Sequence, residues 1–498
     1  MRTSNERGNA LVLSLLLTMV VSVLASSFMF LAQTETYAST NYRLMSQTRY
    51  GAESGVHKAV HYLLNNYPAP GGAGDPLANY NMNVSPVTFN NQPVVLSASA
   101  AVPGNYPVLD TQAAFNAEAQ GALAVGTGTV QYSVYATLMS MKTFTVYGQD
   151  VTAVVQTWKI TADGQLTAGH TADVQVTAVL EQQTVPAATY AAFATNNLCG
   201  ALTLSGNVVT DSYDSSNITY DDGKVVTTQS NGNVGTNGNL TEGGSTTVIN
   251  GQLFTPRTGV GNCKNGAVDA LTANGGATVT GGLVQLPQPV TYPSPAEPSP
   301  EPPTSNVGLK NNDCGGLANP AACTIDSVTK EVRLVPGTQA APVALGNISV
   351  TAGGTIHLGA AAGCPCYYNV NSIKLVGNST VKIDGGPVVF NVQGEDEATP
   401  IDLTGGSLVN LSINPANFQI VYAGTGNVKL AGGNRTAAMV YAPNASVTLA
   451  GGSNFFGSLL AATVSDTGGT AIHYDRHLQA SFEIPGNYVM SSFSWKTY

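Results

Sequence analysis

The chain has 498 residues, only 10% of them charged, and its formal net charge is −10. That length leaves room for two or three domains with a substantial core. The 19 Lys and Arg residues are scattered singly, so no basic stripe would attract a nucleic-acid backbone, and nucleic acid is excluded as a specific partner. Abundant Gly, Asn, Thr and Ser are typical of a turn-rich extracellular β protein.

The chain begins with a membrane-length apolar segment. Ala10–Ala32 contains no charged residue, His, Pro or Gly. As a helix it would span about 34 Å, enough for a bilayer core of about 30 Å. Arg2 and Arg7 precede it, which favours a cytoplasmic N terminus and export of nearly everything after Ala32. A cleaved secretory signal, a plain membrane anchor and a pilin-type assembly helix all begin in this way.

Helical spacing continues beyond the apolar segment, which argues against signal cleavage. Residues that share one face recur three, four or seven apart: Tyr37, Leu44, Thr48, Ala52, Val56, Val60 and Leu64. One helix from Gly8 to Leu64 is predicted, because Asn65-Asn66-Tyr67-Pro68 cannot continue it. Small hydroxyl residues fall four apart along the apolar part: Ser14, Thr18, Ser22 and Ser26. They either let helices approach closely in a membrane or bond to their own helix.

The N-terminal residues resemble those of a known family. Arg7-Gly8-Asn9-Ala10-Leu11-Val12-Leu13, the apolar run and Gly51-Ala52-Glu53-Ser54-Gly55-Val56 are similar to the start of PilX-type minor pilins of type IV pili. The resemblance implies that a prepilin peptidase removes residues 1–8 by cutting between Gly8 and Asn9. It also implies that residues 9–66, including Glu53 and Gly55, form an assembly helix that packs among other pilin subunits.

Two positions depart from the pattern of major pilins. Leu13 stands where major pilins carry a glutamate, and Phe30 where they usually carry a proline. A missing glutamate is tolerated at the tip of a filament, where no subunit above needs its charge. It is also typical of the K-type minor pseudopilin of type II secretion, whose start is similar. The departures favour a minor, tip-located subunit over a major one.

Residues 67–190 are predicted to form a pilin-like region. Residues 67–130 indicate an irregular connection. Thr129–Gln183 is rich in Val, Thr and Tyr and alternates in polarity, which predicts antiparallel strands with a turn at Asp163-Gly164. A short sheet of this kind would bury the stripe of the long helix, as the pilin resemblance also implies.

From about Ala192 onward, short segments rich in Val, Ile, Leu and Thr recur, each closed by Gly-Gly, Gly-Asn or Asn-Gly. Regular short strands fit a β-sandwich or a β-solenoid, and the repeated unit with outward Thr, Ser and Asn favours the solenoid. The predicted fold is mainly β, with solenoid parts at 191–286 and 306–498. Residues 287–305 contain eight prolines, which predict an extended, solvated polyproline excursion between them.

All six cysteines lie in the exported part, and their even number suits an oxidising compartment. We expect Cys314 to pair with Cys323 as a loop staple and Cys199 with Cys263 across neighbouring coils. Cys364-Pro365-Cys366 leaves little chain for a mutual bridge. The spacings supply no four-ligand zinc site, and we expect no metal and no cofactor.

The C-terminal stretch from Ala438 to Leu478 resembles a β-solenoid module attached to PilX-like proteins. Phe493 and Trp495 follow it and are expected to cover the last open coil.

One constellation could carry chemistry. His473, Asp475 and His477 would share one face of a strand and could hold a metal or act as acid and base. The competing interpretation is a hydrogen-bonded strand face in which Asp475 pairs with Arg476 or a histidine. The sequence contains no Gly-x-Ser-x-Gly elbow, His-Glu-x-x-His motif or phosphate loop, so we assign no catalytic residue.

The sequence therefore predicts a minor pilin-like subunit involved in type IV pilus assembly and in tip display or surface adhesion. Its helix would hold it in the inner membrane before assembly, after which it would lie on the pilus or cell surface. Expected partners are other pilin subunits, the assembly machinery, the prepilin peptidase, and a carbohydrate or other surface ligand. Two alternatives are a type II secretion minor pseudopilin and a membrane-anchored or secreted β-solenoid that acts on or binds polysaccharide.

Overall fold

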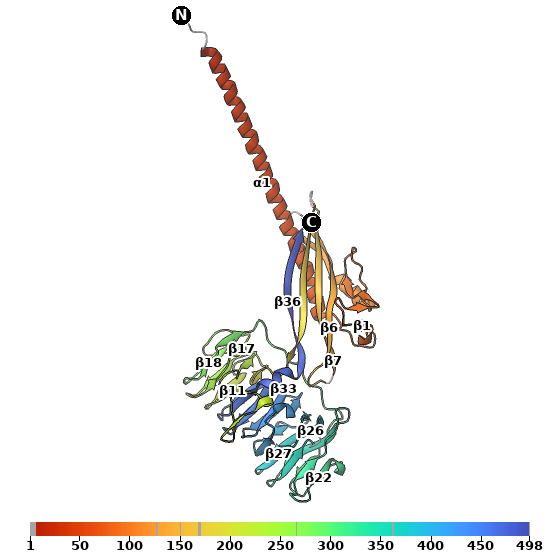
Figure 1. Ribbon diagram of the computed structural model, residues 1–498, viewed down its shortest axis with the longest axis vertical. Helices are drawn as coiled ribbons and strands as arrows, with labels where there is room; N and C mark the ends of the chain where they lie inside the picture. Colours follow the sequence, from red (N-terminus) through yellow and green to blue (C-terminus); the bar gives the residue numbers. More distant parts are fainter. Residues whose placement is uncertain are drawn as a thin grey trace. The chain divides into compact units, whose positions relative to one another are not determined.

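The computed structural model describes residues 6–125, 128–149, 151–167, 171–264, 266–360 and 363–497. The chain forms two compact units, whose elements are labelled in Figure 1. The first unit runs up to Thr143 and adds Ala153–Gln183 and the C-terminal residues from Tyr488. The second contains Phe144–Thr152 and Thr184–Asn487. Most of the second unit is thus an insertion before the last strand of the first.

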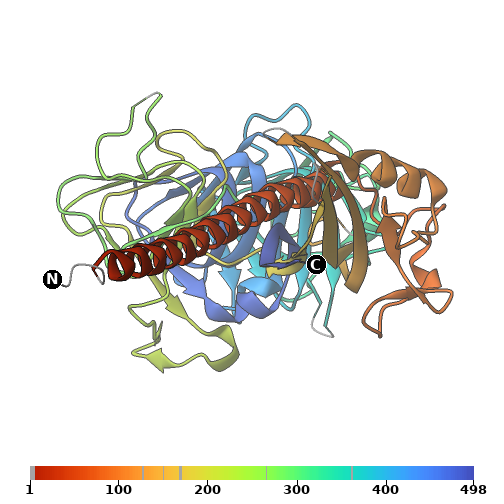
Figure 2. The same ribbon diagram turned by 90° about the horizontal axis from the view of Figure 1, so that it is seen from above.

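A single helix, α1 (Glu6–Asn65), begins the first unit. It runs unbroken in both ribbon views (Figures 1 and 2), as the helical spacing predicts. The helix ends at Asn65 because Pro68 follows and the N–H groups of Asn66 and Tyr67 both bond to the Tyr62 carbonyl. Burial of its side chains begins only at Leu44, so the two halves of α1 have different surroundings.

The inner half of α1 packs on a six-stranded sheet of order β36-β8-β7-β6-β4, in which β5 also pairs with β6. The strands are β4 (Val95–Ser97), β5 (Gln120–Val125), β6 (Gly128–Thr145), β7 (Thr152–Thr167), β8 (Thr171–Pro186) and β36 (Glu483–Thr497). β4 and β5 pair with β6, and β7 pairs with β8, in antiparallel register. Buried residues alternate with less buried ones along β6 and β8, as expected where one face of a sheet is covered.

The turn predicted at Asp163-Gly164 is wrong, because both residues lie inside β7. Gly164 is the point where the strand meets α1, since a Cβ at Gly164 would lie 2.7 Å from the Thr48 carbonyl oxygen. Asp163 accepts a hydrogen bond from the side chain of Gln175 on β8, at 2.9 Å. Close approach of a helix, rather than a turn, therefore accounts for this glycine.

The connection after α1 contains a helix that the sequence analysis missed. Its elements are η1 (Leu77–Asn79), β1 (Tyr80–Asn81), β2 (Thr88–Phe89), β3 (Gln92–Pro93) and α2 (Leu109–Glu118). In α2 only Thr111 and Phe115 are buried, so the helix lacks the apolar stripe that would have predicted it. The Phe115 ring meets the Tyr62 ring of α1 edge to face, with centroids 5.4 Å apart.

The second unit consists mainly of short parallel strands stacked on one another. Its N-terminal half contains β9 (Ala192–Ala194), β10 (Leu202–Ser205), β11 (Val209–Tyr213), β14 (Val234–Thr236), β15 (Leu240–Gly243), β16 (Val248–Ile249), β17 (Leu253–Thr255), β18 (Leu271–Ala273), β19 (Thr278–Val279) and β20 (Leu283–Gln285). Register aligns like residues, so that Leu202, Leu240 and Leu271 follow one another across β10, β15 and β18.

The C-terminal half continues the same parallel pairing. Its main strands are β21 (Asn306–Leu309), β24 (Val343–Val350), β26 (Cys366–Leu375), β28 (Val388–Val392), β29 (Ile401–Asp402), β31 (Phe418–Tyr422), β32 (Asn427–Ala431), β33 (Ala437–Ala450), β34 (Asn454–Asp466) and β35 (Ala471–Asp475). In the core, Tyr368, Phe390 and Phe418 follow one another with ring centroids 6.1 Å apart.

Smaller elements complete the second unit. A separate sheet contains β22 (Cys323–Ile325), β23 (Val332–Leu334), β25 (Thr355–Leu358), β27 (Ser379–Ile383) and β30 (Gly406–Asn410). β12 (Tyr220–Asp221) and β13 (Lys224–Val225) form a hairpin, and single 3-10 turns are η2 (Ser215–Asn217), η3 (Pro320–Ala322), η4 (Pro415–Asn417) and η5 (Arg476–Ala480).

The order of strands in the stack differs from their order in the chain. β34 pairs in parallel with both β9 and β10, and β35 pairs with β11. From β9 the pairing continues outward through β14 and β17 to β20. From β21 it returns through β24 and β26 toward β34. The chain thus enters in the middle of the stack, and its last layer pairs with its first.

The Pro-rich segment connects the two outer strands, β20 and β21; most of its residues are exposed, as predicted, but one side of it is packed. Pro295, Pro298 and Pro302 are buried. A polyproline helix has three residues per turn and no internal hydrogen bonds, so one side of it can pack while its carbonyls accept bonds from outside. Stack side chains donate these bonds: Tyr441 to Pro293 O at 2.7 Å and Asn369 to Pro300 O at 2.8 Å.

Three disulfides cross-link the second unit. Cys199 joins Cys263, and Cys314 joins Cys323, which are the two pairs expected from the sequence. The third joins Cys364 to Cys366, contrary to the expectation that so short a segment would not bridge. The backbone bends at Pro365 enough to bring the two Cα atoms to 4.7 Å, within the range of ordinary disulfides.

The C-terminal residues do not cover the end of the stack. β36 pairs with β8 at the edge of the antiparallel sheet. Trp495 lies under the Arg49 guanidinium of α1, 5.2 Å from the ring centroid, and remains 54% exposed, while Phe493 is 42% exposed. The predicted capping role of these two residues is therefore wrong, because their strand belongs to the first unit.

Candidate functional site

The outer half of α1 exposes a long apolar surface. Leu13 is 72% exposed and Phe30 is 69% exposed. Asn9–Asn65 is long and apolar enough to cross a membrane, with a mean hydropathy of 2.3 in its most apolar window. An exposed apolar surface of this size is covered in the functional state by lipid or by other protein.

The stripe of small hydroxyl residues bonds to its own helix. Ser14 donates to the Leu11 carbonyl, Thr18 to the Ser14 carbonyl and Ser22 to the Thr18 carbonyl, over 2.7 to 3.0 Å. Ser26 continues the series with a 2.9 Å bond to the Ser22 carbonyl. The hydroxyls are satisfied within α1, so what the stripe presents to a neighbouring helix is a small, hydrogen-bonded surface.

The inner half of α1 is shaped for close contact with the sheet. A Cβ at Gly55 would lie 2.9 Å from atoms of both Tyr132 and Val134, and one at Gly51 would overlap Val130. Glu53, between the two glycines in sequence, forms a 2.7 Å ion pair with Arg49 one helical turn earlier. The two glycines, together with Gly164 on β7, allow helix and sheet to approach closely, which any larger residue would prevent.

The predicted cleavage junction lies near the start of α1. Residues Gly8 and Asn9 fall within the helix, and residues 1–5 of the predicted leader lie outside the described part of the chain.

The predicted constellation of His473, Asp475 and His477 does not lie on one strand, as the sequence analysis expected. β35 ends at Asp475, and His477 lies in η5 with an exposed side chain. His473 instead lies between Asp211 Oδ1, 2.5 Å from Nδ1, and Asn454 Oδ1, 3.0 Å from Nε2.

Asp475 also differs from both expectations. It accepts hydrogen bonds from the backbone N–H groups of Ser215 and His477 rather than pairing with Arg476 or a histidine ring. Its burial raises the pKa of the carboxyl above the ordinary value.

A second histidine network was not singled out from the sequence. His357 on β25 places Nδ1 2.9 Å from Asp384 and Nε2 2.8 Å from Glu331. Arg333, the neighbour of His357 across the β23–β25 pairing, forms an ion pair with the same Asp384. Within the described residues, no group of three His, Cys, Asp or Glu side chains could hold a metal ion. This network links neighbouring strands and offers no metal centre.

Two acidic side chains point into the stack. Leu204 of β10 is in register with Glu242 of the neighbouring strand β15 and with Asp466 of the strand on its other side, β34. Both acidic residues are fully buried. Burial raises the pKa of Glu242 to about 7 and that of Asp466 to about 6. Asp466 accepts hydrogen bonds from Gly468 and Thr470, whereas neither carboxylate oxygen of Glu242 has a partner among the described residues.

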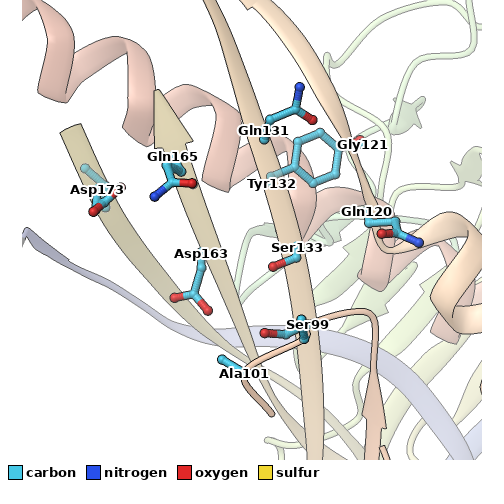
Figure 3. Close-up of a pocket in the computed structure, with 13 residues that line it drawn as sticks. Ser99, Ala101, Gln120, Gly121, Gln131, Tyr132, Ser133, Asp163, Gln165 and Asp173 are labelled. Atoms are coloured by element: carbon cyan, nitrogen blue, oxygen red, sulfur yellow. The ribbon is translucent and has the colours of Figure 1, made fainter. Parts of the chain in front are cut away.

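The first unit carries an open polar cavity of about 750 Å³ on its sheet (Figure 3). Asp163 and Gln165 of β7 and Asp173 of β8 line one side, and Ser133 of β6 lies opposite. The described lining residues supply carboxylates, amides and hydroxyls, and none of them is Lys, Arg, His or Cys. It can form hydrogen bonds, but it offers no paired base and nucleophile.

Comparisons with known proteins identify the N-terminal segment. Residues 7–57 match the family profile described as PilX N-terminal, and these residues contain the junction, the apolar run and the glycine contacts described above. This segment is therefore similar to the start of PilX-type minor pilins. The similarity supports a role related to type IV pilins.

A second family model matches part of the remainder of the chain. Residues 367–481 match a family described as Domain of unknown function (DUF7305). No curated protein matches. Among solved structures, the chain was aligned with the competence-associated pilin ComZ from Thermus thermophilus, at 12% identity over 91% of this chain and 98% of that one. The TM-score is 0.24, so this superposition supports no structural argument.

Proposed function

We propose that the chain is a minor subunit of a type IV pilus that displays a β-solenoid outside the filament. It is made as a prepilin, held in the inner membrane by α1, cut between Gly8 and Asn9 by a prepilin peptidase, and transferred into the filament by the assembly machinery. The observation that carries the proposal is the PilX-type α1, whose outer half exposes an apolar surface while its inner half is packed on a sheet.

Two features support a position at the tip. Leu13 replaces the glutamate of major pilins, whose negative charge a neighbouring subunit would neutralise. A subunit without that charge needs no such neighbour above it. In addition, a large second unit is more easily accommodated at an end than along a filament of closely packed subunits.

The parallel stack supports the solenoid interpretation. Its strands repeat in register through β9, β14, β17 and β20, which is the pairing of successive coils rather than of an antiparallel sandwich. We take residues 191–286 and 306–498 as its parts, joined by 287–305, except that β36 returns to the pilin-like region of residues 67–190. In this proposal the weakly charged outer surface of the solenoid contacts carbohydrate on a surface.

N-terminal sequencing tests the pilin part of the proposal. The full chain is produced with and without a prepilin peptidase, and the N terminus and intact mass are measured. We expect a start at Asn9 only when the peptidase is present. An uncut Met1, or a start near Ser26 in both hosts, would remove the proposal.

An excision variant tests the display part. Because β36 pairs with β8, residues 187–482 can be replaced by a short Asn-Gly turn that joins the two strands directly. We expect this variant to enter pili but to lose attachment to surfaces. Attachment equal to that of the parent would contradict the adhesion role.

Two alternatives predict different outcomes. A type II secretion minor pseudopilin would be processed in the same way, but its loss would block protein secretion and leave piliation intact. A membrane-anchored or secreted solenoid acting on polysaccharide would need no processing at Asn9, and the purified protein would shorten a polysaccharide.

A further inference from the structure

The second unit contains a cavity of about 540 Å³. Its volume lies within the range of about 300–1,000 Å³ that is usual for small-molecule sites. Part of its lining lies within residues 367–481, which match the domain of unknown function: Tyr367, Pro387, Val389, Asn391, Gln419 and Ala480. The other described lining residues are 145–148, Gln339, Phe482 and Glu483.

The floor of the cavity is a row of outward side chains on three neighbouring strands. Register aligns Tyr367 of β26 with Val389 of β28, and Val389 with Gln419 of β31. The residues on either side of each one in its strand are buried in the core, so all three face away from it. Asn391 extends the floor by one further row.

The wall is fixed to this floor by hydrogen bonds and ring packing. The Tyr147 hydroxyl donates to Gln419 Oε1 at 3.0 Å, and Gln419 Nε2 donates to the Ala416 carbonyl at 2.8 Å. The Tyr147 ring packs on Phe482, with centroids 4.7 Å apart. A site whose side chains are already held in place loses little freedom when a ligand binds.

Backbone strain lies at the same place. Phe482 has φ of +64°, in the left-handed region that a bulky side chain rarely adopts. It is held there by neighbours on both sides, since the Ala187 N–H bonds to the Phe482 carbonyl and the Tyr147 N–H bonds to the Glu483 carbonyl. Such strain is often kept at binding sites, and here it directs the Phe482 ring to the wall of the cavity.

The lining chemistry indicates the ligand. Tyr147, Tyr367 and Phe482 supply aromatic surfaces, while Gln339, Asn391 and Gln419 supply amides that both donate and accept hydrogen bonds. Among the described lining residues Glu483 is the one that is charged, and none is Lys, Arg or His. Anions such as phosphates or uronates would find no counter-charge in such a site.

We propose that this cavity binds one neutral sugar unit of a surface polysaccharide. A pyranose has an apolar ring face that suits an aromatic side chain and a rim of hydroxyls that suits amides and a carboxylate. This inference rests on the proposed display of the second unit, and it names the site through which that unit would act.

Binding of oligosaccharides to the full chain tests the inference. The chain is purified in lauryldimethylamine oxide, a detergent without a sugar headgroup, and titrated with maltohexaose, cellohexaose and laminarihexaose, with oligogalacturonate as the anionic probe. We expect at least one neutral probe to bind. Tyr367→Ala should weaken that binding about tenfold, and Gln339→Ala about fivefold.

Matched controls exchange the same residue types elsewhere in the unit. Tyr220→Ala, on the β12–β13 hairpin, and Gln285→Ala, on β20, are exposed and lie outside the cavity, so affinity should not change. Thermal unfolding of each variant is measured in parallel. If Tyr367→Ala unfolds, the exposed Gln339 decides the outcome.

Three results would overturn the inference: no neutral probe binds the folded parent, oligogalacturonate alone binds, or a bound neutral probe is insensitive to both cavity variants. These failures are distinguishable from failure of the proposed function. Surface attachment that is lost on excision of 187–482 but retained in the cavity variants would leave the adhesion role intact and place it elsewhere on the unit.

Discussion

In the first unit, strands of 16 to 18 residues pair antiparallel and pack against one helix. In the second, strands such as β11 and β16, with five and two residues, pair in parallel with the layers above and below. In the first unit, the helix meets the sheet through close contacts at Gly51, Gly55 and Gly164. The second unit repeats similar apolar contacts layer after layer. We therefore expect a cavity to disturb several layers of the second unit, and an added atom at these three glycines to push helix and sheet apart in the first.

The largest expected effect is a cavity in the stack. Phe390→Ala removes a buried ring that lies between Tyr368 and Phe418, and should lower the free energy of unfolding by about 3–5 kcal/mol. Denaturant unfolding of the full chain in detergent measures it. Val376→Ala, at an exposed position of the same unit, is the control. A loss below about 1 kcal/mol would mean that neighbouring layers close the cavity.

An added methyl group at Gly164 should disrupt the contact between helix and sheet in the first unit. Gly164→Ala would place a Cβ 2.7 Å from the Thr48 backbone oxygen, which cannot move without shifting α1. We expect a loss of about 3 kcal/mol, seen as faster hydrogen exchange in β6 and β7 but not in the stack. Gly72→Ala adds the same group where no atom lies within 4 Å. Equal effects of the two substitutions would contradict the helix contact.

A pH dependence should separate the units further. The pKa of Glu242 rises from 4.5 to about 7 on folding, so between these values the unfolded state loses a proton that the folded state keeps. Stability of the second unit therefore falls as pH rises from about 4.5 through 7, by about 3 kcal/mol, and the decrease from Glu242 levels off at about pH 8.

Glu242→Gln tests this assignment. The variant should show a flatter stability profile between pH 4.5 and 7, measured by denaturant unfolding, while the exposed Glu297→Gln should retain the parent profile. An unchanged slope in Glu242→Gln would assign the pH dependence to other groups, such as the buried Asp466.

The smallest expected effect concerns Trp495. It distinguishes the observed location of the C-terminal strand, in the first unit, from the location expected from the sequence, over the last open coil. Trp495→Ala removes the contact with Arg49 and should cost about 0.5–1 kcal/mol in the first unit. A double-mutant cycle with Arg49→Gln isolates the pairwise part. If hydrogen exchange instead increased in the stack, the capping role expected from the sequence would be restored.

Features that depend on local pattern were predictable from the sequence. The unbroken helical spacing up to Leu64 fixed α1, and the PilX-type residues were recognisable because they are contiguous. The β character of both units followed from alternating Val and Thr and from regularly placed turns. Gly164 was misread because a glycine in a strand has the same local signature whether it turns the chain or admits a helix.

Features that depend on distant partners were not predictable. His473 was singled out, but its partner Asp211 lies 262 positions earlier in the chain, and the expected neighbour His477 lies beyond the end of the strand. The cavity combines Tyr147, Tyr367 and Phe482, which no spacing rule connects. Side chains alternate between the core and the outer face along β26, β28 and β31. This alternation could have shown that Tyr367 and Gln419 lie on the outer face, but not that they belong to one site.

The pairing of the last layer with the first has a consequence for the order in which the second unit can fold. Strand β9, at Ala192, obtains its neighbour on one side only when Leu459 of β34 has emerged. Until then the edge of the first layer is unpaired, and contacts between residues this far apart form slowly. Chains that stop before β34 would leave that edge open to other chains. The last strands of the parallel stack, rather than its first, therefore decide whether the protein remains monomeric while it folds.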